Sequence, residues 1–311
     1  MCVFLKGEIK MIKILESQNA FGVMNTGSIT FDNLTYEDKK FLCEKYHIDI
    51  SGFQEYIKNM PSDIWKANKK EIFKTHRIKF GETMGINWKH MFMADQDVKK
   101  SGSRGSSFEI TKDYVEANPN GWSNIAEDLL VIKNDVPGVV IGHPVADCPV
   151  VMMVDQKQKI AIIGHCGGPL IDEKLPMMIS EALRSKYDSR LDDIFTYVSA
   201  CAGDTWTYDS KPDWANDNDF WRNYIIYNTE DKLFHINLRA ALLEQLIKSG
   251  LDTDKMKFNL DDTITDTRYY SNAMQRINPS RGGRHFAGLC FDNNNDDNII
   301  LLKPDVLVKK R

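Results

Sequence analysis

Cys148 and His165 are the residues of this sequence whose types and spacing are best suited to chemistry. Each stands beside a run of apolar, β-branched residues, 150–154 after the cysteine and 160–164 before the histidine, and the polar segment 155–159 separates the two runs. This pattern predicts two antiparallel strands joined by a short loop. A thiol and an imidazole would then meet at the open end of one hairpin.

The pairing register decides which side chains face each other at that end. If Val154 pairs with Ile160, then Cys148 lies opposite Cys166 and one position diagonal from His165. Directly opposed residues have Cβ atoms about 5 Å apart, and diagonal ones are somewhat farther apart. We therefore expect the thiol and the imidazole to be close neighbours.

Two kinds of chemistry fit this pair. Cys and His are preferred ligands of Zn²⁺, and a catalytic zinc site needs a third protein ligand and an open position. His90 or His143 could supply the third ligand, and their spacing does not decide between them. Alternatively, a thiolate activated by the imidazole is a nucleophile. The structural alternative is a buried thiol beside a core histidine, since free Cys is often buried.

Several neighbouring residues extend the candidate site. Asp147 directly precedes the cysteine and is counted with the candidate catalytic group. Gly167 and Gly168 follow the second strand, where their backbone N–H groups could bind an anion or merely form a tight turn. Arg281 and Arg284 are suited to phosphate or carboxylate, although loop arginines are often only solvated.

Composition and charge narrow the class of protein. The 311 residues are 42% hydrophobic and 27% charged, as in ordinary globular proteins. The net charge of −4 gives no electrostatic footprint for nucleic acid. No apolar run reaches the ~18 residues of a membrane span, and the first residues do not form a secretory signal. Six scattered cysteines without a Cys-x-x-Cys motif indicate reduced thiols, so we expect a cytoplasmic protein. Oligomeric state is not predicted.

Hydrophobic periodicity predicts the elements that position these residues. Helices are expected over residues 36–46, 53–60, 172–187 with Asp172 as N-cap, and 237–249 capped by Asn237. The aromatic, acidic stretch 206–227 is a long connection that could wall a pocket. Further strands are expected over residues 21–24, 28–31, 86–93, 126–132, 139–142, 194–198, 256–260, 286–291 and 299–302.

Helices and strands mix without strict alternation, and at least one hairpin is antiparallel. This favours an α+β fold (mixed α/β), with mixed sheets and helices on the outside, over a doubly wound parallel sheet. We find no domain boundary and expect a single domain over residues 1–311.

The motifs resemble the YfiH family, once described as multicopper polyphenol oxidases (laccase domain) and since regarded as zinc-dependent purine nucleoside phosphorylases. Val-Ala-Asp-Cys-Pro-Val at 145–150 is similar to the family's Thr-Ala-Asp-Cys-x-Pro-Val, and His-Cys-Gly-Gly-Pro at 165–169 to its His-Ala-Gly-Trp-Arg-Gly. Trp-Lys-His-Met at 88–91 stands where the family has Gln-Val-His-Gly, and Arg-Gly-Gly-Arg at 281–284 where it has Arg-Thr-Gly-Arg. The resemblance is clearest over 86–291, and residues 1–80 match only loosely.

The resemblance implies a fold, a metal and a reaction. The fold is a layered α/β/β/α sandwich, shared with the deamidase domain of the cytotoxic necrotizing factor toxins. The zinc ligands would be His90, Cys148 and His165. Copper is not expected, because this chain has no multi-His copper pattern. The reaction would be phosphorolysis of adenosine, inosine, guanosine and methylthioadenosine, with some adenosine deamination, and the partners a purine nucleoside and inorganic phosphate.

The chain departs from the family pattern in ways that leave other functions open. One residue is missing between Cys148 and Pro149, and Gly168-Pro169 replaces the family's Trp-Arg. The alternative hypotheses are a metal-independent Cys–His amidohydrolase or deamidase, and a catalytically inactive relative that binds a nucleotide or a protein.

Overall fold

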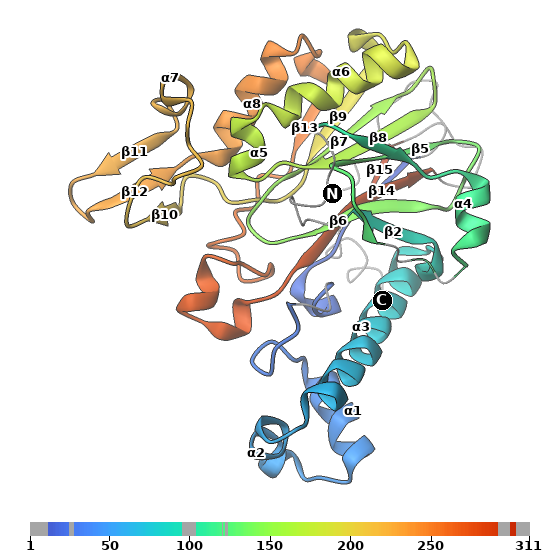
Figure 1. Cartoon of the computed structure of the whole chain (residues 1–311), viewed down its shortest axis with the longest axis vertical. Coiled ribbons are helices and arrows are strands. Elements are labelled where there is room, and N and C mark those ends of the chain that lie inside the picture. Colours follow the sequence, from blue (N-terminus) through green and yellow to red (C-terminus); the bar gives the residue numbers. More distant parts are fainter. Residues whose placement is uncertain are drawn as a thin grey trace.

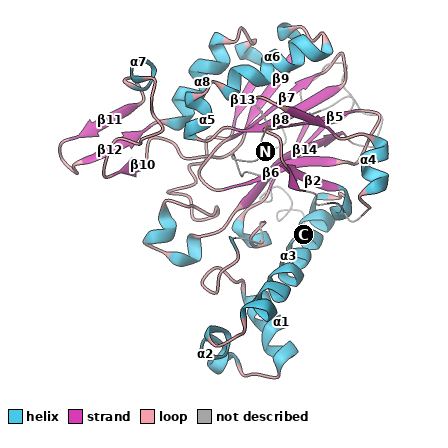
Figure 2. Ribbon diagram, viewed as in Figure 1, coloured by secondary structure: helices cyan, strands magenta, loops and turns pink. Residues whose placement is uncertain are grey.

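The computed structural model describes residues 12–24, 28–94, 104–119, 121, 124–291 and 299–302. Within these ranges two six-stranded sheets stack face to face, and helices cover their outer faces (Figures 1 and 2). The predicted mixed α/β fold with mixed sheets is confirmed.

The first sheet combines parallel and antiparallel pairs. Its strand order is β15-β1-β14-β6-β2-β4. Strand β14 runs antiparallel to both β1 and β6, whereas β6, β2 and β4 are mutually parallel. The strands are β1 (Ile12–Glu16), β2 (Met91–Ala94), β4 (Asn124–Ile125), β6 (Val140–Val145), β14 (His285–Phe291) and β15 (Ile299–Leu302).

The second sheet contains the predicted hairpin at its centre. Its order is β13-β9-β7-β8-β5-β3, and β7 runs antiparallel to β8. The register pairs Val150 with His165, one residue away from the predicted pairing of Val154 with Ile160. The strands are β3 (Ser107–Glu109), β5 (Leu129–Lys133), β7 (Val150–Asp155), β8 (Ile160–His165), β9 (Ile194–Val198) and β13 (Met256–Phe258).

Apolar side chains fill three spaces and define four layers. Between the sheets, Ile141 and Val145 of β6 meet Ala161 and Ile163 of β8. A second cluster packs the outer face of the second sheet against α5 (Gly168–Asp172), α6 (Leu175–Tyr187) and α8 (Leu238–Lys248). A third packs the first sheet against α1 (Tyr36–Tyr46), α2 (Phe53–Lys58) and α3 (Ser62–Met84). The layers therefore run α/β/β/α.

Smaller elements complete the described chain. A three-stranded sheet, in the order β10-β12-β11, projects from the side of the sandwich (Figure 1). These elements are α4 (Lys112–Ala117), α7 (Asn218–Trp221), β10 (Trp206–Tyr208), β11 (Ile225–Asn228), β12 (Leu233–Ile236) and the 3₁₀ helices η1 (Asn19–Phe21), η3 (Ile50–Gly52), η4 (Trp88–His90), η5 (Leu191–Asp193), η6 (Thr253–Lys255), η7 (Met274–Arg276) and η8 (Pro279–Arg281). None of the described helices is long and apolar enough to cross a bilayer.

The helix predictions have mixed outcomes. The helix expected over 36–46 has those bounds, and Asn237 caps α8 by accepting from the Ala240 N–H at 2.9 Å. Asp172 is not an N-cap: it ends α5, and its carboxylate accepts from Trp221 Nε1 at 2.7 Å. The longest described helix, α3, was not predicted.

The expected strands near the N-terminus are corrected as well. Residues 19–21 form a 3₁₀ helix and 28–31 form no strand, whereas 25–27 lie outside the described residues. Residues 88–90 form a 3₁₀ helix, and the strand there begins only at Met91. Residues 95–103 also lie outside the described residues.

A buried ion-pair geometry holds α3 against α1. His76 Nε2 lies 2.9 Å from an Asp38 carboxylate oxygen, and His76 Nδ1 lies 3.1 Å from the Val23 carbonyl oxygen. Asp38 also accepts from the Thr35 N–H at 2.8 Å as part of a capping box. Burial by itself raises the pKa of Asp38, but the hydrogen bonds from His76 and Thr35 outweigh it and hold the pKa below its usual value.

We predict that Asp38→Asn lowers the free energy of unfolding by about 2 kcal/mol at pH 7, because buried hydrogen bonds to a charged acceptor are lost. Since the folded pKa lies below the unfolded one, the stabilisation is complete above the unfolded pKa of about 3.9 and declines as the pH falls through the folded pKa. Urea denaturation at several pH values should therefore show the difference from wild type shrinking below pH ~4. Exposed Glu37→Gln, in the same helical turn, is the control and should change little.

Candidate functional site

Cys148 and His165 converge beside Gly167, as predicted. Cys148 lies in the link between β6 and β7, His165 ends β8, and Gly167 precedes α5. A Cβ placed on Gly167 would lie 3.2 Å from Cys148 Sγ and 3.6 Å from His165 Nε2. Both side chains are partly exposed, so the pair is accessible at the edge of the sandwich. A glycine here leaves the two reactive groups the space to approach each other.

Asp147 is held in a fixed position beneath this pair. Its backbone is left-handed, with φ 74°, and its side chain is buried. The carboxylate accepts from Thr263 Oγ1 at 2.8 Å and from the Ala273 N–H at 2.7 Å. Burial raises the pKa of Asp147, and these hydrogen bonds oppose that rise. The structure thus gives Asp147, predicted as catalytic, hydrogen bonds that position the neighbouring Cys148.

The electrostatics of the pair favour two neutral groups. Burial raises the pKa of the Cys148 thiol to about 12, the Asp147 charge adds to the rise, and Arg284 opposes it. Burial and then Arg284 lower the pKa of His165 to about 4. A thiolate–imidazolium pair, which a thiol nucleophile needs, is therefore disfavoured at neutral pH. A neutral imidazole is the form that binds a metal.

Arg281 is not placed to hold phosphate, contrary to the prediction. Its buried guanidinium donates to four backbone carbonyls, from Nε to Tyr269 O at 3.0 Å and from Nη2 to Thr263 O at 2.7 Å, Asp266 O at 3.1 Å and Ile264 O at 3.3 Å. These bonds fold the segment that carries Thr263, the partner of the site's buried carboxylate. Arg281 therefore has a structural role, because it holds the segment whose Thr263 binds Asp147.

Arg284 is the arginine that lies near the reactive pair. It is partly exposed and donates from Nη1 to the Gly283 carbonyl oxygen at 2.7 Å. Its charge lowers the pKa of His165 and opposes the rise in the pKa of Cys148. Of the two predicted arginines, this one keeps a cation at the site.

We predict that Arg281→Gln lowers the free energy of unfolding by about 3 kcal/mol, because several buried carbonyls lose a charged donor. Arg284→Gln, the matched control, should change it by less than about 1 kcal/mol. Urea denaturation of the two variants measures both effects. Equal losses in the two variants would contradict these different roles.

The structure does not bring His90 to Cys148 and His165. Parallel pairing of β2 with β6 sets Met91 opposite Val140, so His90 lies level with the start of β6. Cys148 follows the other end of β6, about 20 Å away along the strand. Across the described residues, no three or more His, Cys, Asp or Glu side chains are grouped so that they could hold a metal ion. The ligand set implied by the resemblance is not assembled.

His143 is the histidine that the structure places beside His165. Their ring centroids are 6.0 Å apart, with 36° between the ring planes. His143 is 2% exposed, and among the described residues neither of its ring nitrogens has a hydrogen-bond partner. Burial and then the proximity of His165 lower the pKa of His143 to about 3. Two neutral imidazoles and a thiol suit zinc as donor types, and the orphaned His143 nitrogens fit a ligand's role.

Two aromatic residues and a third histidine complete the surroundings. A Cβ on Gly168 would lie 2.6 Å from the Trp214 ring, so this ring covers the glycine that replaces the family's tryptophan. Burial raises the pKa of Tyr208, the nearby Cys148 adds to the rise, and a hydrogen bond with Trp214 opposes it. Tyr208 and Trp214 both belong to the aromatic stretch 206–227. His285, buried with its ring against Tyr269, was missed because a single histidine in a strand carries no spacing signal.

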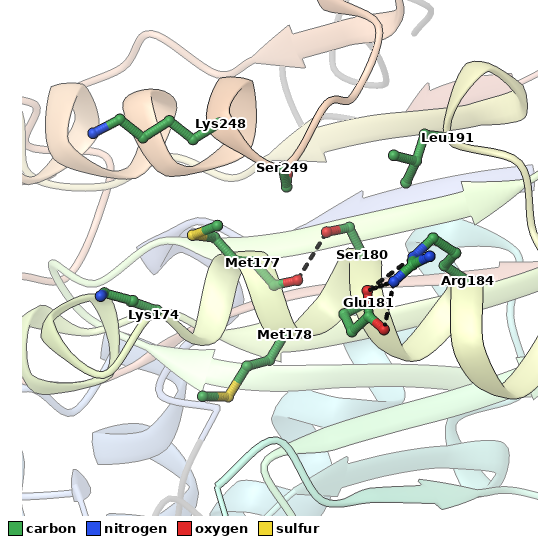
Figure 3. A pocket seen from close by; sticks show the side chains of 9 residues that line it. All are labelled: Lys174, Met177, Met178, Ser180, Glu181, Arg184, Leu191, Lys248 and Ser249. Carbon is green, nitrogen blue, oxygen red and sulfur yellow. Dashed lines mark hydrogen bonds and ion pairs between the residues drawn. The ribbon is translucent and has the colours of Figure 1, made fainter.

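Other thiols and hollows lie apart from this site. Cys166 is fully buried in the cluster beneath α5 and α6, on the opposite face from His165. A groove on the helical layer between α6 and α8 is lined by Lys174, Met177, Met178, Ser180, Glu181, Arg184, Leu191, Lys248 and Ser249 (Figure 3). Its arginine pairs with Glu181 in the same helix. Its lining residues include no cysteine or histidine.

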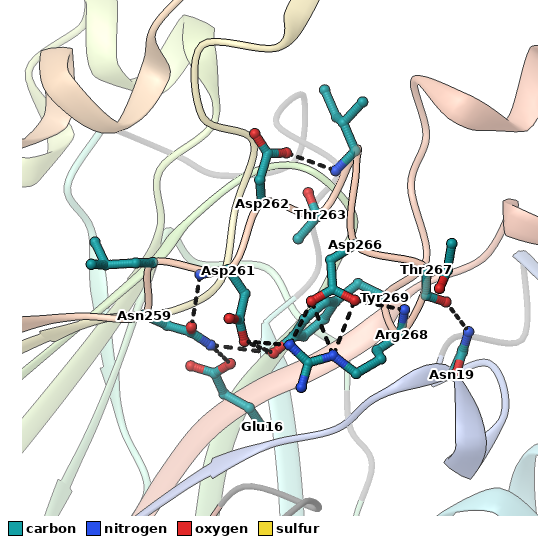
Figure 4. A network of polar contacts seen from close by, with 12 residues as sticks. Glu16, Asn19, Asn259, Asp261, Asp262, Thr263, Asp266, Thr267, Arg268 and Tyr269 are labelled. Atoms are coloured by element: carbon teal, nitrogen blue, oxygen red, sulfur yellow. Dashed lines mark hydrogen bonds and ion pairs between the residues drawn. The ribbon is translucent and has the colours of Figure 1, made fainter. Parts of the chain in front are cut away.

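A buried polar network supports the segment that holds Asp147. Glu16 accepts from Tyr197 Oη at 2.8 Å. It also accepts from Asn259 Nδ2 at 2.7 Å, and Tyr269 Oη donates to Asp261 at 2.9 Å (Figure 4). These residues come from β1, β9 and the connection after β13. Both sheets are thereby linked to the segment that reaches the site.

The model of the family described as multi-copper polyphenol oxidoreductase laccase matches residues 69–292. The chain belongs to this family. The match covers the whole second sheet, the strands β2, β4, β6 and β14 of the first sheet, and the Cys148–His165 hairpin. No curated protein matches the chain.

Solved structures show the same fold at low identity. The hypothetical protein YfiH of Bacillus licheniformis is 15% identical, with a TM-score of 0.57 over 71% of this chain and 82% of that one. YlmD of Geobacillus stearothermophilus is 15% identical, with a TM-score of 0.58 over 72% and 81%. A Neisseria meningitidis protein of family DUF152 is 12% identical, with a TM-score of 0.58 over 94% and 99%. The fold is therefore that of the YfiH and DUF152 proteins.

Proposed function

We propose that this chain is a zinc-dependent enzyme that cleaves purine nucleosides by phosphorolysis. The observation that carries the proposal is the convergence of Cys148 and His165 beside Gly167, within the residues that the family model matches. The neutral state of His165 suits a metal ligand better than it suits a partner of a thiolate. Zinc, when bound, supplies polarisation of a substrate oxygen or activation of water.

Side chains around Cys148 and His165 are suited to binding a nucleoside and an anion. Tyr208 and Trp214 form an aromatic wall, against which a planar base can stack. Arg284 provides a partly exposed cation, suited to phosphate. In phosphorolysis a phosphate oxygen bonds to C1′ of the ribose as the bond from C1′ to the purine breaks. The electron pair leaves with the purine, which takes up a proton.

The test is zinc content and phosphate-dependent release of purine. We expect about one zinc per chain in protein purified without chelator or a histidine tag, and its loss in Cys148→Ala. The folded state should persist, as judged by circular dichroism. Cys43→Ala, which alters a half-buried thiol on α1, is the control and should keep its zinc.

Two results would contradict the proposal. Absence of zinc, together with alkylation of Cys148 by iodoacetamide at neutral pH, would indicate the metal-independent Cys–His hydrolase. Bound zinc without turnover of adenosine, inosine, guanosine or methylthioadenosine would indicate a binding protein instead.

The aromatic wall gives a second prediction. Trp214→Ala should raise KM for the nucleoside by about tenfold, because base–aromatic stacking contributes about 1–3 kcal/mol. The KM for phosphate should stay nearly constant, since Trp214 contributes no charge. Tyr227→Ala, an exposed aromatic on β11, is the control and should leave both constants unchanged. If Trp214→Ala kept the wild-type KM for the nucleoside, the Trp214 ring would not be part of the nucleoside-binding site.

A further inference from the structure

The two sheets present histidines to each other across the central core. In β6, Ile141 and Val145 face the space between the sheets, so His143, which alternates in step with them, faces it as well. In β8, Ala161 and Ile163 also face this space, and His165 alternates in step with them, so it faces the space as well. The two rings approach to 6.0 Å between centroids. The imidazoles of β6 and β8 therefore meet between the two sheets.

The His143 ring lacks the hydrogen bonds that a buried imidazole requires. Both of its nitrogens are enclosed and without a partner among the described residues. Leaving a buried polar atom unpaired destabilises the folded protein. The same chain pairs both nitrogens of its buried His76, with Val23 and Asp38. An imidazole with free nitrogens beside His165 therefore calls for a ligand.

His90 and His285 are weaker candidates than His143 for the third protein ligand of zinc. His90 lies at the far end of β6 from Cys148, and zinc ligands stand within about 4 Å of one another. His285 is also buried with unpaired nitrogens, but its ring packs against Tyr269, with 5.2 Å between the ring centroids. His143 combines unpaired ring nitrogens with a ring contact to His165.

We infer that His143, rather than His90, completes the zinc site with Cys148 and His165. The inference rests on the proposed zinc dependence and names a ligand from β6 instead of the segment before β2. Because the described side chains do not yet form a finished ligand set, binding must draw His143 or Cys148 toward His165. The site would comprise two imidazoles and one thiolate, with a fourth position open to substrate.

The experiment compares zinc content in His143→Ala and His90→Ala. We expect His90→Ala to keep about one zinc per chain and His143→Ala to lose it, by elemental analysis of protein dialysed against limiting Zn²⁺. His143→Leu, which fills the buried space with an apolar side chain, should also lose zinc and guards against a variant that fails to fold. Co²⁺-loaded wild type should show a thiolate-to-cobalt absorption band that His143→Leu lacks.

A measurement on the unaltered protein makes the test independent of variants. Anomalous scattering from zinc-soaked crystals should place the metal about 2.1 Å from a His143 ring nitrogen. Zinc lost in His90→Ala but kept in His143→Ala, or kept in both, would overturn the inference while leaving the zinc enzyme intact. A peak bonded to His285 would overturn it as well. Wild type without zinc would overturn the proposed metal dependence itself, and the inference with it.

Discussion

Burial of both faces of the two central sheets is the constraint on which the rest of the structure depends. Strands β6, β7 and β14 are buried along their whole length, and so is β8 up to His165, so a polar side chain in them needs a partner inside the protein. The apolar majority supplies the driving force for stacking the sheets. The few exceptions, among them His143 and His285, stand out because the surrounding core offers them no hydrogen bond. Of these two residues, His143 lies beside His165 at the candidate site.

The site is assembled by segments that the core holds from two sides. Glu16 at the end of β1 binds Tyr197 of β9, so one carboxylate links the two sheets. The same carboxylate holds Asn259, where the chain turns towards the segment that carries Thr263. Thr263 then binds Asp147, next to Cys148. Each step is a buried hydrogen bond in a low-dielectric interior, where such bonds are strong and costly to leave unmade. The thiol is placed by this chain of contacts and not by the hairpin alone.

Several side chains around the hairpin have roles other than those that the family resemblance implies. Gly168 lacks the tryptophan side chain of the family motif, and Trp214 from the connection after β10 packs over it. Arg281 matches the first arginine of the Arg-Gly-Gly-Arg motif, but its guanidinium donates to backbone carbonyls. Arg284, the second arginine, instead lowers the pKa of His165. Matching a motif residue by residue therefore identifies positions better than roles. The environment of each side chain decides what it can bind.

The sequence by itself determined the parts whose signals are local. Alternation and β-branched runs predicted the hairpin at β7 and β8, capping residues and apolar stripes predicted α1 and α8, and the motifs around Cys148 and His165 predicted the family. The α3 helix was missed because its charged surface weakens the apolar stripe that marks a helix. Only the tertiary structure decided the one-residue register of the hairpin, the isolation of His90 and the nearness of His143 to His165. Those outcomes depend on which strands pair and which faces meet, and such contacts join residues that are far apart in sequence and leave no local pattern.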